Sequence, residues 1–187
     1  MLQFAQAWIK MEAAQVKFHV FSGNAEDVFE RLDKGLLDFG LIIGPANISK
    51  YDSILVPATD VWGVLMRKDS PLSMRDAIRP TDLWDVPLIA SRQRLVSGDI
   101  AKWIGKDYEE LNVVATYNLI YNASLMVEQG MGYSLALDKL VNTTGSSNLC
   151  FRPLSPKLEA KIYIVWKRYQ VFSKAADIFL SKLRQSF

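Results

Sequence analysis

Residues 22–44 read SGNAEDVFERLDKGLLDFGLIIG, and this stretch decides the fold class. Asn24 is a favourable N-cap, and two acidic residues follow it in the first turn, where they complement the helix dipole. Gly35 stands where a helix commonly ends in a left-handed residue. Residues 39–43 then form an apolar run, which is typical of a strand covered on both faces. The stretch therefore predicts a helix followed directly by a buried strand.

The same succession of helix, glycine and strand recurs along the chain. Residues 16–21 are rich in β-formers, so residues 16–43 predict a strand–helix–strand unit. Further helices are expected at residues 98–104, capped by Ser97 and stopped by Gly105, and at residues 123–129, stopped by Gly130. The other expected elements are strands at 54–56, 61–66, 88–90, 113–116, 133–137 and 162–166, helices at 2–14 and 173–187, and a helical turn capped by Asp82. This alternation favours a parallel sheet with helices on its faces.

The order of these elements predicts an α/β fold of two lobes, each a doubly wound and mainly parallel sheet. We expect lobe I to comprise residues 1–59 and 160–187, and lobe II residues 60–159. The chain would cross between the lobes near Thr59 and again near Glu159. Two lobes joined by two crossovers predict a ligand cleft between them.

Composition excludes several classes of function for these residues. The chain has 187 residues, half of them hydrophobic, with 22 Lys and Arg against 20 Asp and Glu. This near balance lacks the basic stripe of a nucleic-acid-binding surface. The single cysteine, Cys150, and the single histidine, His19, exclude an intrachain disulfide, a Cys-based zinc site and a poly-His metal centre. Neither a signal peptide nor a membrane span is expected, so we predict a cytoplasmic protein without membrane association.

The motifs of common enzyme classes do not occur. His19 alternates with apolar neighbours on an expected strand, where a packed or edge histidine is the favoured interpretation over a catalytic triad member. The chain contains neither G-x-G-x-x-G nor G-x-x-x-x-G-K-[ST]. We therefore expect no enzyme, no cofactor and no metal site.

Four short motifs, in order and over nearly the whole chain, resemble the effector-binding domain of LysR-type transcriptional regulators. They are Gly35-Leu36-Leu37-Asp38-Phe39, Lys68-Asp69-Ser70-Pro71-Leu72, Asp82-Leu83 with Pro87-Leu88-Ile89, and Met126-Val127-Glu128-Gln129-Gly130-Met131-Gly132. The resemblance implies a fold like type 2 periplasmic binding proteins. It also implies a domain that senses a small-molecule effector, forms a homodimer (a tetramer in the full-length regulator) and acts on DNA only through an N-terminal domain that this chain lacks.

Two departures and two alternatives accompany this resemblance. The family's N-terminal winged helix-turn-helix and long linker helix are not found in this sequence. The chain also starts in the helix expected at residues 2–14, without the family's first strand, so we expect a fragment of a longer regulator. An extracytoplasmic solute-binding protein of a transporter, with the same bilobed fold, is the leading alternative. The other alternative is a domain with a purely structural role in dimerisation and a closed cleft.

Ligands of such sheets lie beyond the carboxyl ends of the strands, close to helix N-termini. Three loops occupy that position, and their polar residues are the predicted effector contacts. These residues are Ser22, Gly23 and Asn24, then Ser91, Arg92, Gln93 and Arg94, then Tyr117 and Asn118. Arginine suits carboxylate recognition, so an acid is the expected effector class, while Tyr117 and Tyr121 leave an aromatic or mixed ligand open.

Asp38 lies at the amino end of the expected strand 39–43, at the sheet edge opposite the ligand edge. A carboxylate placed after a turn readily accepts hydrogen bonds from nearby backbone N–H groups. We therefore expect Asp38 to cap the turn that begins at Gly35, and assign it no chemistry.

Overall fold

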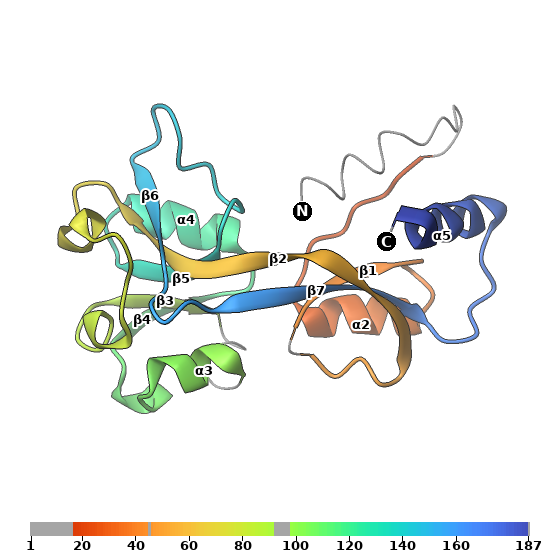
Figure 1. Cartoon of the computed structure of the whole chain (residues 1–187), viewed down its shortest axis with the longest axis horizontal. Helices are drawn as coiled ribbons and strands as arrows, with labels where there is room; N and C mark the ends of the chain where they lie inside the picture. The colour runs from red at the N-terminus through yellow and green to blue at the C-terminus, as the bar shows by residue number, and fades with distance from the viewer. Residues whose placement is uncertain (1–16, 45, 92–97, 187) are drawn as a thin grey trace. The chain divides into compact units, whose positions relative to one another are not determined.

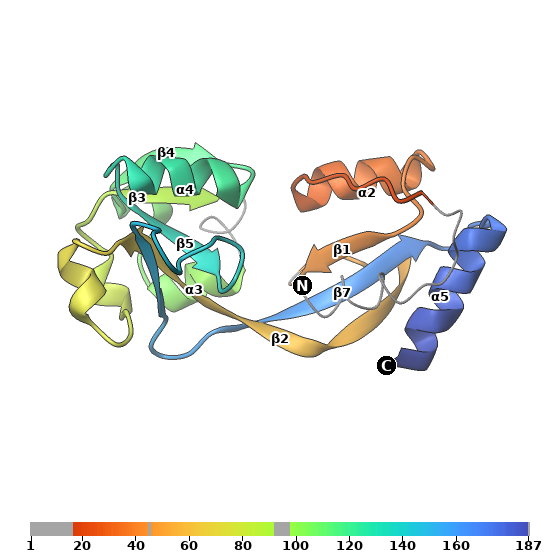
Figure 2. The ribbon, with the colours of Figure 1, turned by 90° about the horizontal axis from the view of Figure 1, so that it is seen from above.

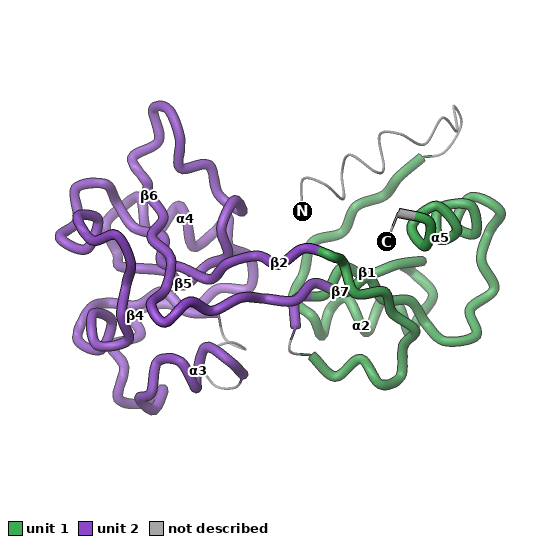
Figure 3. Tube along the Cα trace, viewed as in Figure 1, with its two compact units in different colours: residues 1–42, 46–57, 163–187 green, residues 43–45, 58–162 purple. Residues whose placement is uncertain are grey.

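The computed structural model describes residues 17–44, 46–91 and 98–186. The chain divides into two compact units, coloured separately in Figure 3. The first contains the described parts of residues 1–42, 46–57 and 163–187, and the second contains the described parts of residues 43–45 and 58–162. Both β2 (Tyr51–Arg67) and β7 (Glu159–Lys167) contribute residues to each unit. The lobe boundaries expected from the sequence stay a prediction.

The first unit has helices on both faces of a small sheet. Within it, β7 lies between β1 (Gly40–Ile43) and β2 (Figure 2). Helices α2 (Ala25–Asp33) and α5 (Lys174–Ser186) lie on opposite sides of these strands (Figure 1).

Successive residues of β7 show how this unit builds two cores. Val165 packs in one cluster with Val28 and Leu32 of α2. Its neighbour Ile164 packs in another cluster with Phe179 and Leu183 of α5. Because side chains alternate between the faces of a strand, adjacent apolar residues of β7 bury against both helices. Burial on both faces accounts for the continuous apolar run at residues 162–166 of β7.

Both ends of α2 follow the predicted pattern. Asn24 Oδ1 accepts the Asp27 N–H at 2.9 Å, and the Asp27 carboxylate accepts the Asn24 N–H at 3.2 Å, so a capping box closes the N-terminus. At the other end Gly35 has the left-handed φ of 68°. The N–H groups of Gly35 and Leu36 donate to the carbonyls of Leu32 (3.0 Å) and Arg31 (2.8 Å).

The predicted capping role of Asp38 is wrong. Backbone carbonyls of α2 already accept the N–H groups of Lys34, Gly35 and Leu36, so these donors are not available to a carboxylate. The side chain of Asp38 is exposed, and among the described residues it accepts no hydrogen bond.

The second unit contains a mixed sheet. Its strands are β3 (Leu88–Ser91), β4 (Val113–Tyr117), β5 (Tyr133–Leu137), β6 (Leu149–Pro153) and the end of β2. Their order is β2-β5-β3-β4, and β6 pairs with β2. The pairs β3–β4 and β3–β5 are parallel, as the helix–glycine–strand passages predict, whereas β2 runs antiparallel to both β5 and β6. The α/β class is confirmed.

Helices α3 (Asp99–Ile104) and α4 (Ile120–Glu128) cover opposite faces of this sheet (Figure 1). Leu88 packs in the cluster that contains Ile100 and Ile104 of α3, while its neighbour Ile89 packs with Ala123 and Val127 of α4. Short 3-10 turns lie at Pro71–Met74, Pro80–Asp82 and Tyr108–Glu110.

Several predicted elements differ from the structure. Residues 17–21 form neither helix nor strand and are not part of the sheet, although they are rich in β-formers, because β-propensity alone does not determine strand pairing. Asp82 ends its turn instead of starting a helix, and its carboxylate accepts the Arg79 N–H at 2.9 Å. The two extended runs expected at 54–56 and 61–66 form one continuous β2. The helix predicted at 2–14 lies outside the described residues.

Among the described residues, no helix combines the length and the apolar character that crossing a bilayer requires.

Candidate functional site

The carboxyl ends of β3 and β4 bring two predicted site residues together in the second unit. In the parallel ladder between these strands Ser91 is the register partner of Tyr117, and both are the last residues of their strands. Asn118 follows immediately and is exposed. Since parallel strands end at one edge of a sheet, these three residues form an edge next to the start of α4.

Tyr117 supports this edge from the core. Its hydroxyl donates to the Leu135 carbonyl of β5 at 2.9 Å, and its ring packs against the cluster below α4. A phenol fixed in this way holds the end of β4 in position. The Tyr117 hydroxyl is thus engaged in the core, while the side chain of Asn118 is exposed and that of Ser91 is half-buried.

The N-terminus of α4 is open to an anion. Its N-cap is Leu119, which provides no side-chain hydrogen bond, and its first turn contains no acidic residue. The first N–H groups of a helix lack intrahelical partners and carry the positive end of the dipole. The helix begins at Ile120, three residues before the predicted start, because no polar cap marks its beginning in the sequence. Asn122, expected just before the helix, lies in its first turn.

The N-terminus of α2, in the first unit, is different. Asn24 is engaged in the capping box, and the acidic side chains of Glu26 and Asp27 stand in the first turn. A carboxylate ligand would be repelled by these two charges. Ser22 is exposed, and Gly23 is close to Phe21, since a Cβ at position 23 would lie 2.8 Å from the Phe21 ring. Effector contacts by these three residues stay a prediction.

Arg92, Gln93 and Arg94, together with the proposed cap Ser97, lie outside the described residues. The prediction that this loop contacts an effector therefore remains open.

A pocket in the second unit contains residues that the sequence did not single out as a site. It has a volume of about 390 Å³ and is lined by Lys68, Ser73, Met74, Thr143, Cys150, Phe151 and Arg152. Within the residues that the structure describes, no group of three His, Cys, Asp or Glu side chains could hold a metal ion. The sequence analysis included Lys68 only in the family motif at residues 68–72. The strand that contains Cys150 was not predicted.

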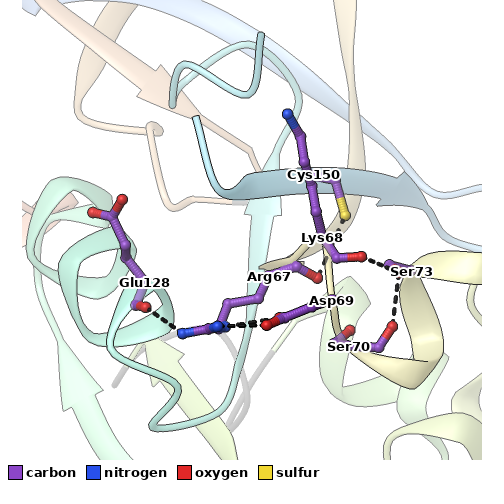
Figure 4. Close-up of polar contacts among 7 residues, drawn as sticks. All are labelled: Arg67, Lys68, Asp69, Ser70, Ser73, Glu128 and Cys150. Atoms are coloured by element: carbon purple, nitrogen blue, oxygen red, sulfur yellow. Dashed lines mark hydrogen bonds and ion pairs between the residues drawn. The ribbon is translucent and has the colours of Figure 1, made fainter. Parts of the chain in front are cut away.

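A polar network surrounds the end of β2 beside this pocket (Figure 4). The Arg67 guanidinium donates to the Asp69 carboxylate (Nε–Oδ1 2.8 Å) and to the Glu128 carbonyl at the end of α4 (3.1 Å). Ser73 Oγ lies 2.7 Å from the carbonyls of both Lys68 and Ser70. Burial raises the pKa of the Cys150 thiol, although the nearby Arg152 and Lys68 charges act in the opposite direction.

The sequence matches the LysR substrate binding domain family over residues 9–187, nearly its full length. The chain belongs to this family. No curated protein matches the sequence.

Solved structures share the fold of this LysR substrate binding domain. HinK, a LysR family transcriptional regulator from Pseudomonas aeruginosa, has 16% identity and a TM-score of 0.73, with 99% of this chain and 65% of that chain covered. The CcmR regulatory domain from Synechocystis PCC6803, in complex with 2-PG, has 16% identity and a TM-score of 0.75, covering 99% and 90%. The effector binding domain of QuiR, in complex with shikimate, has 18% identity and a TM-score of 0.76, covering 98% and 88%. This LysR domain thus spans about 65% of the length of HinK.

Proposed function

We propose that the chain is the effector-sensing domain of a LysR-type transcriptional regulator. The observation that carries this proposal is the family match over residues 9–187. Two proteins of similar fold are described in complex with small acids or their derivatives, 2-PG and shikimate. The solute-binding alternative is not favoured, because the matching family is that of the regulators.

In the second unit, the effector would contact the edge formed by Ser91, Tyr117 and Asn118. The register of β3 and β4 supports this position, and the neighbouring N-terminus of α4 has neither a side-chain cap nor an acidic residue. Backbone N–H groups at such a terminus favour a negative ligand group. A small carboxylic acid, with Asn118 donating through its side-chain amide, is the class that this edge fits.

The regulatory step belongs to a longer protein. An effector shifts a conformational equilibrium only through its different affinity for the two states. In the proposed regulator that shift would alter DNA binding by a separate domain, within a cytoplasmic homodimer that assembles into a tetramer in the full-length protein. This role requires neither catalysis nor a cofactor. Light scattering of the purified chain tests the dimer directly.

A thermal melt against a panel of small acids tests the sensing role. The panel contains shikimate, 2-PG, aromatic acids, amino acids and organic acids. A ligand present at about 100 times its dissociation constant adds about 2.7 kcal/mol to stability. For a chain of this length the expected rise in Tm is roughly 5–10 °C.

Two asparagine variants localise the response. Asn118→Ala removes the amide at the proposed edge, and Asn112→Ala removes an exposed amide just before the opposite end of the same strand, β4. We expect Asn118→Ala to lower the shift in Tm and Asn112→Ala to preserve it. Absence of any shift across the panel, from a chain that melts cooperatively, would oppose the proposed function.

A further inference from the structure

The pocket of about 390 Å³ in the second unit lies beside β6, on a different part of this unit from the edge at Ser91 and Tyr117. Its walls come from β6, from the end of β2 with the turn Pro71–Met74, and from the segment around Thr143. A volume of this size falls in the range of small-ligand sites.

Two cations line this pocket without a carboxylate partner. Among the described residues, Lys68 Nζ donates only to the Gly145 carbonyl, at 3.5 Å. The Arg152 guanidinium donates to the carbonyls of Ser73 (Nη2–O 2.8 Å) and Arg75 (Nε–O 2.8 Å). Neither side chain forms an ion pair with any Asp or Glu that the structure describes. The nearest acid in the chain, Asp69, is already paired with Arg67 (Figure 4).

The carbonyl contacts make the Arg152 charge a fixed part of the pocket wall. Three backbone carbonyls, those of Ser73, Arg75 and Phe151, accept its hydrogen bonds. These carbonyl oxygens accept hydrogen bonds from the Arg152 guanidinium, but they carry no net charge and so do not neutralise it. The charges of Arg152 and Lys68 both act on the Cys150 thiol. Each lowers the pKa of this thiol, whereas burial raises it. The pocket therefore carries a concentrated positive potential.

The open edge of β6 adds a backbone donor. Lys68 N–H donates to the Asn148 carbonyl at 2.8 Å, and Leu154 N–H donates to the Trp62 carbonyl at 3.0 Å, so even-numbered residues of β6 bond to β2. Hydrogen bonds alternate along an antiparallel strand. The N–H and carbonyl of Phe151 accordingly point to the opposite edge, where its carbonyl accepts Arg152 Nη1 at 3.0 Å.

We infer that this pocket is a second ligand site, which binds a small oxyanion of the phosphate class between Lys68, Arg152, Thr143 and the N–H of Phe151. Lys68 and Arg152 contribute two positive charges, and the hydroxyl and N–H groups contribute neutral donors that suit tetrahedral oxygens. The ligand is either free phosphate or the phosphate group of a metabolite. The inference does not depend on the proposed effector edge.

Titration with inorganic phosphate at constant ionic strength tests the site. Binding is followed by calorimetry and by the NMR signals of the Phe151 and Thr143 amides, which report on the pocket itself. Lys68→Gln removes one charge from the pocket, and Lys102→Gln removes the same charge from an exposed position on α3. We expect saturable binding, weakened about tenfold or more by Lys68→Gln and unchanged by Lys102→Gln. Arg152 is left intact because it also holds the turn at Ser73.

Replacing the phosphate by glucose 1-phosphate or another sugar phosphate distinguishes the two sources. Binding of the free anion alone supports a phosphate site, and tighter binding of the ester supports a metabolite site; both support the inference. Equal affinities of wild type and Lys68→Gln would overturn it, as would absence of saturable binding. Loss of phosphate binding in Asn118→Ala with retention in Lys68→Gln would also overturn it, because the anion would then lie at the β3–β4 edge.

Discussion

Ser91 and Tyr117 are register partners at the carboxyl ends of two parallel strands. The Tyr117 hydroxyl is bonded to the Leu135 carbonyl of β5, so the end of β4 is fixed to the strand on the far side of β3. This leaves Asn118 exposed beside a helix N-terminus that has no side-chain cap. Core contacts thus fix the carboxyl ends of β3 and β4, beside which the polar residues lie. Ligand sites of open α/β sheets have this arrangement.

Gly63 is predicted to be difficult to replace. A Cβ there would lie 2.2 Å from the Phe151 ring and 2.4 Å from the Arg152 carbonyl oxygen, which belongs to the backbone of β6. We expect Gly63→Ala to lower the free energy of unfolding by about 3 kcal/mol or more.

Gly40→Ala in the first unit is the comparison. Its Cβ would meet the side chain of Val28 at 2.7 Å and no backbone atom among its nearest contacts, so a smaller loss of about 1–2 kcal/mol is expected. Urea unfolding of both variants gives the two values. Equal stability of Gly63→Ala and wild type would contradict the described pairing of β2 with β6.

Tyr51 is predicted to make the first unit sensitive to alkaline pH. Burial, followed by the hydrogen bond from its hydroxyl to Asp33 Oδ1 (3.0 Å), raises the pKa of Tyr51 from 10.0 to about 12. Because the folded-state pKa lies above the unfolded value, the protonated hydroxyl stabilises the fold fully below pH 10, and this contribution is lost as pH rises from 10 to 12.

Tyr51→Phe removes this contribution. At neutral pH the variant should be about 1 kcal/mol less stable, because the hydrogen bond to Asp33 is lost. The difference between wild type and variant should narrow as the pH rises above 10 and should reverse sign by about pH 12, as measured by chemical unfolding across that range. A difference that stays constant with pH would show that Tyr51 titrates normally.

Cys150 is predicted to react slowly in the folded protein. The thiol is buried, burial raises its pKa, and Sγ lies 3.8 Å from the Arg67 carbonyl (Figure 4). A thiol reagent at pH 8 should modify it roughly 100-fold more slowly than in urea-unfolded protein, since the thiolate is the reacting form and access requires opening. Equal rates in the two states would show that the β6 segment opens readily.

Local chemistry made part of this fold predictable. The N-cap Asn24 and the left-handed Gly35 are determined by neighbouring residues, and both are confirmed. The strand predicted at residues 16–21 was not confirmed, because β-propensity does not determine which strands pair. Residues 17–21 are not part of the sheet. The strand β6 was missed because its residues, LCFRP, lack alternation and end in proline.

The candidate edge was partly predictable for the same reason. Polar residues that follow the strands predicted at 88–90 and 113–116 indicated a shared edge, and the register pairs Ser91 with Tyr117, while contact with an effector stays a prediction. The side-chain role of Tyr117 was not predictable, because its partner, the Leu135 carbonyl, is distant in the sequence. The pocket at Lys68 and Arg152 was not predictable for a similar reason. It depends on the pairing of β2 with β6, which local sequence patterns do not indicate.

The most direct test of the central claim is amide chemical-shift mapping with an acid that stabilises the chain in the melt. The account predicts saturable shifts of the Ser91 and Asn118 amides and of the first residues of α4, with a dissociation constant that Asn118→Ala weakens and Asn112→Ala does not. Saturable shifts that leave this edge unchanged, with the same affinity in Asn118→Ala, would contradict it.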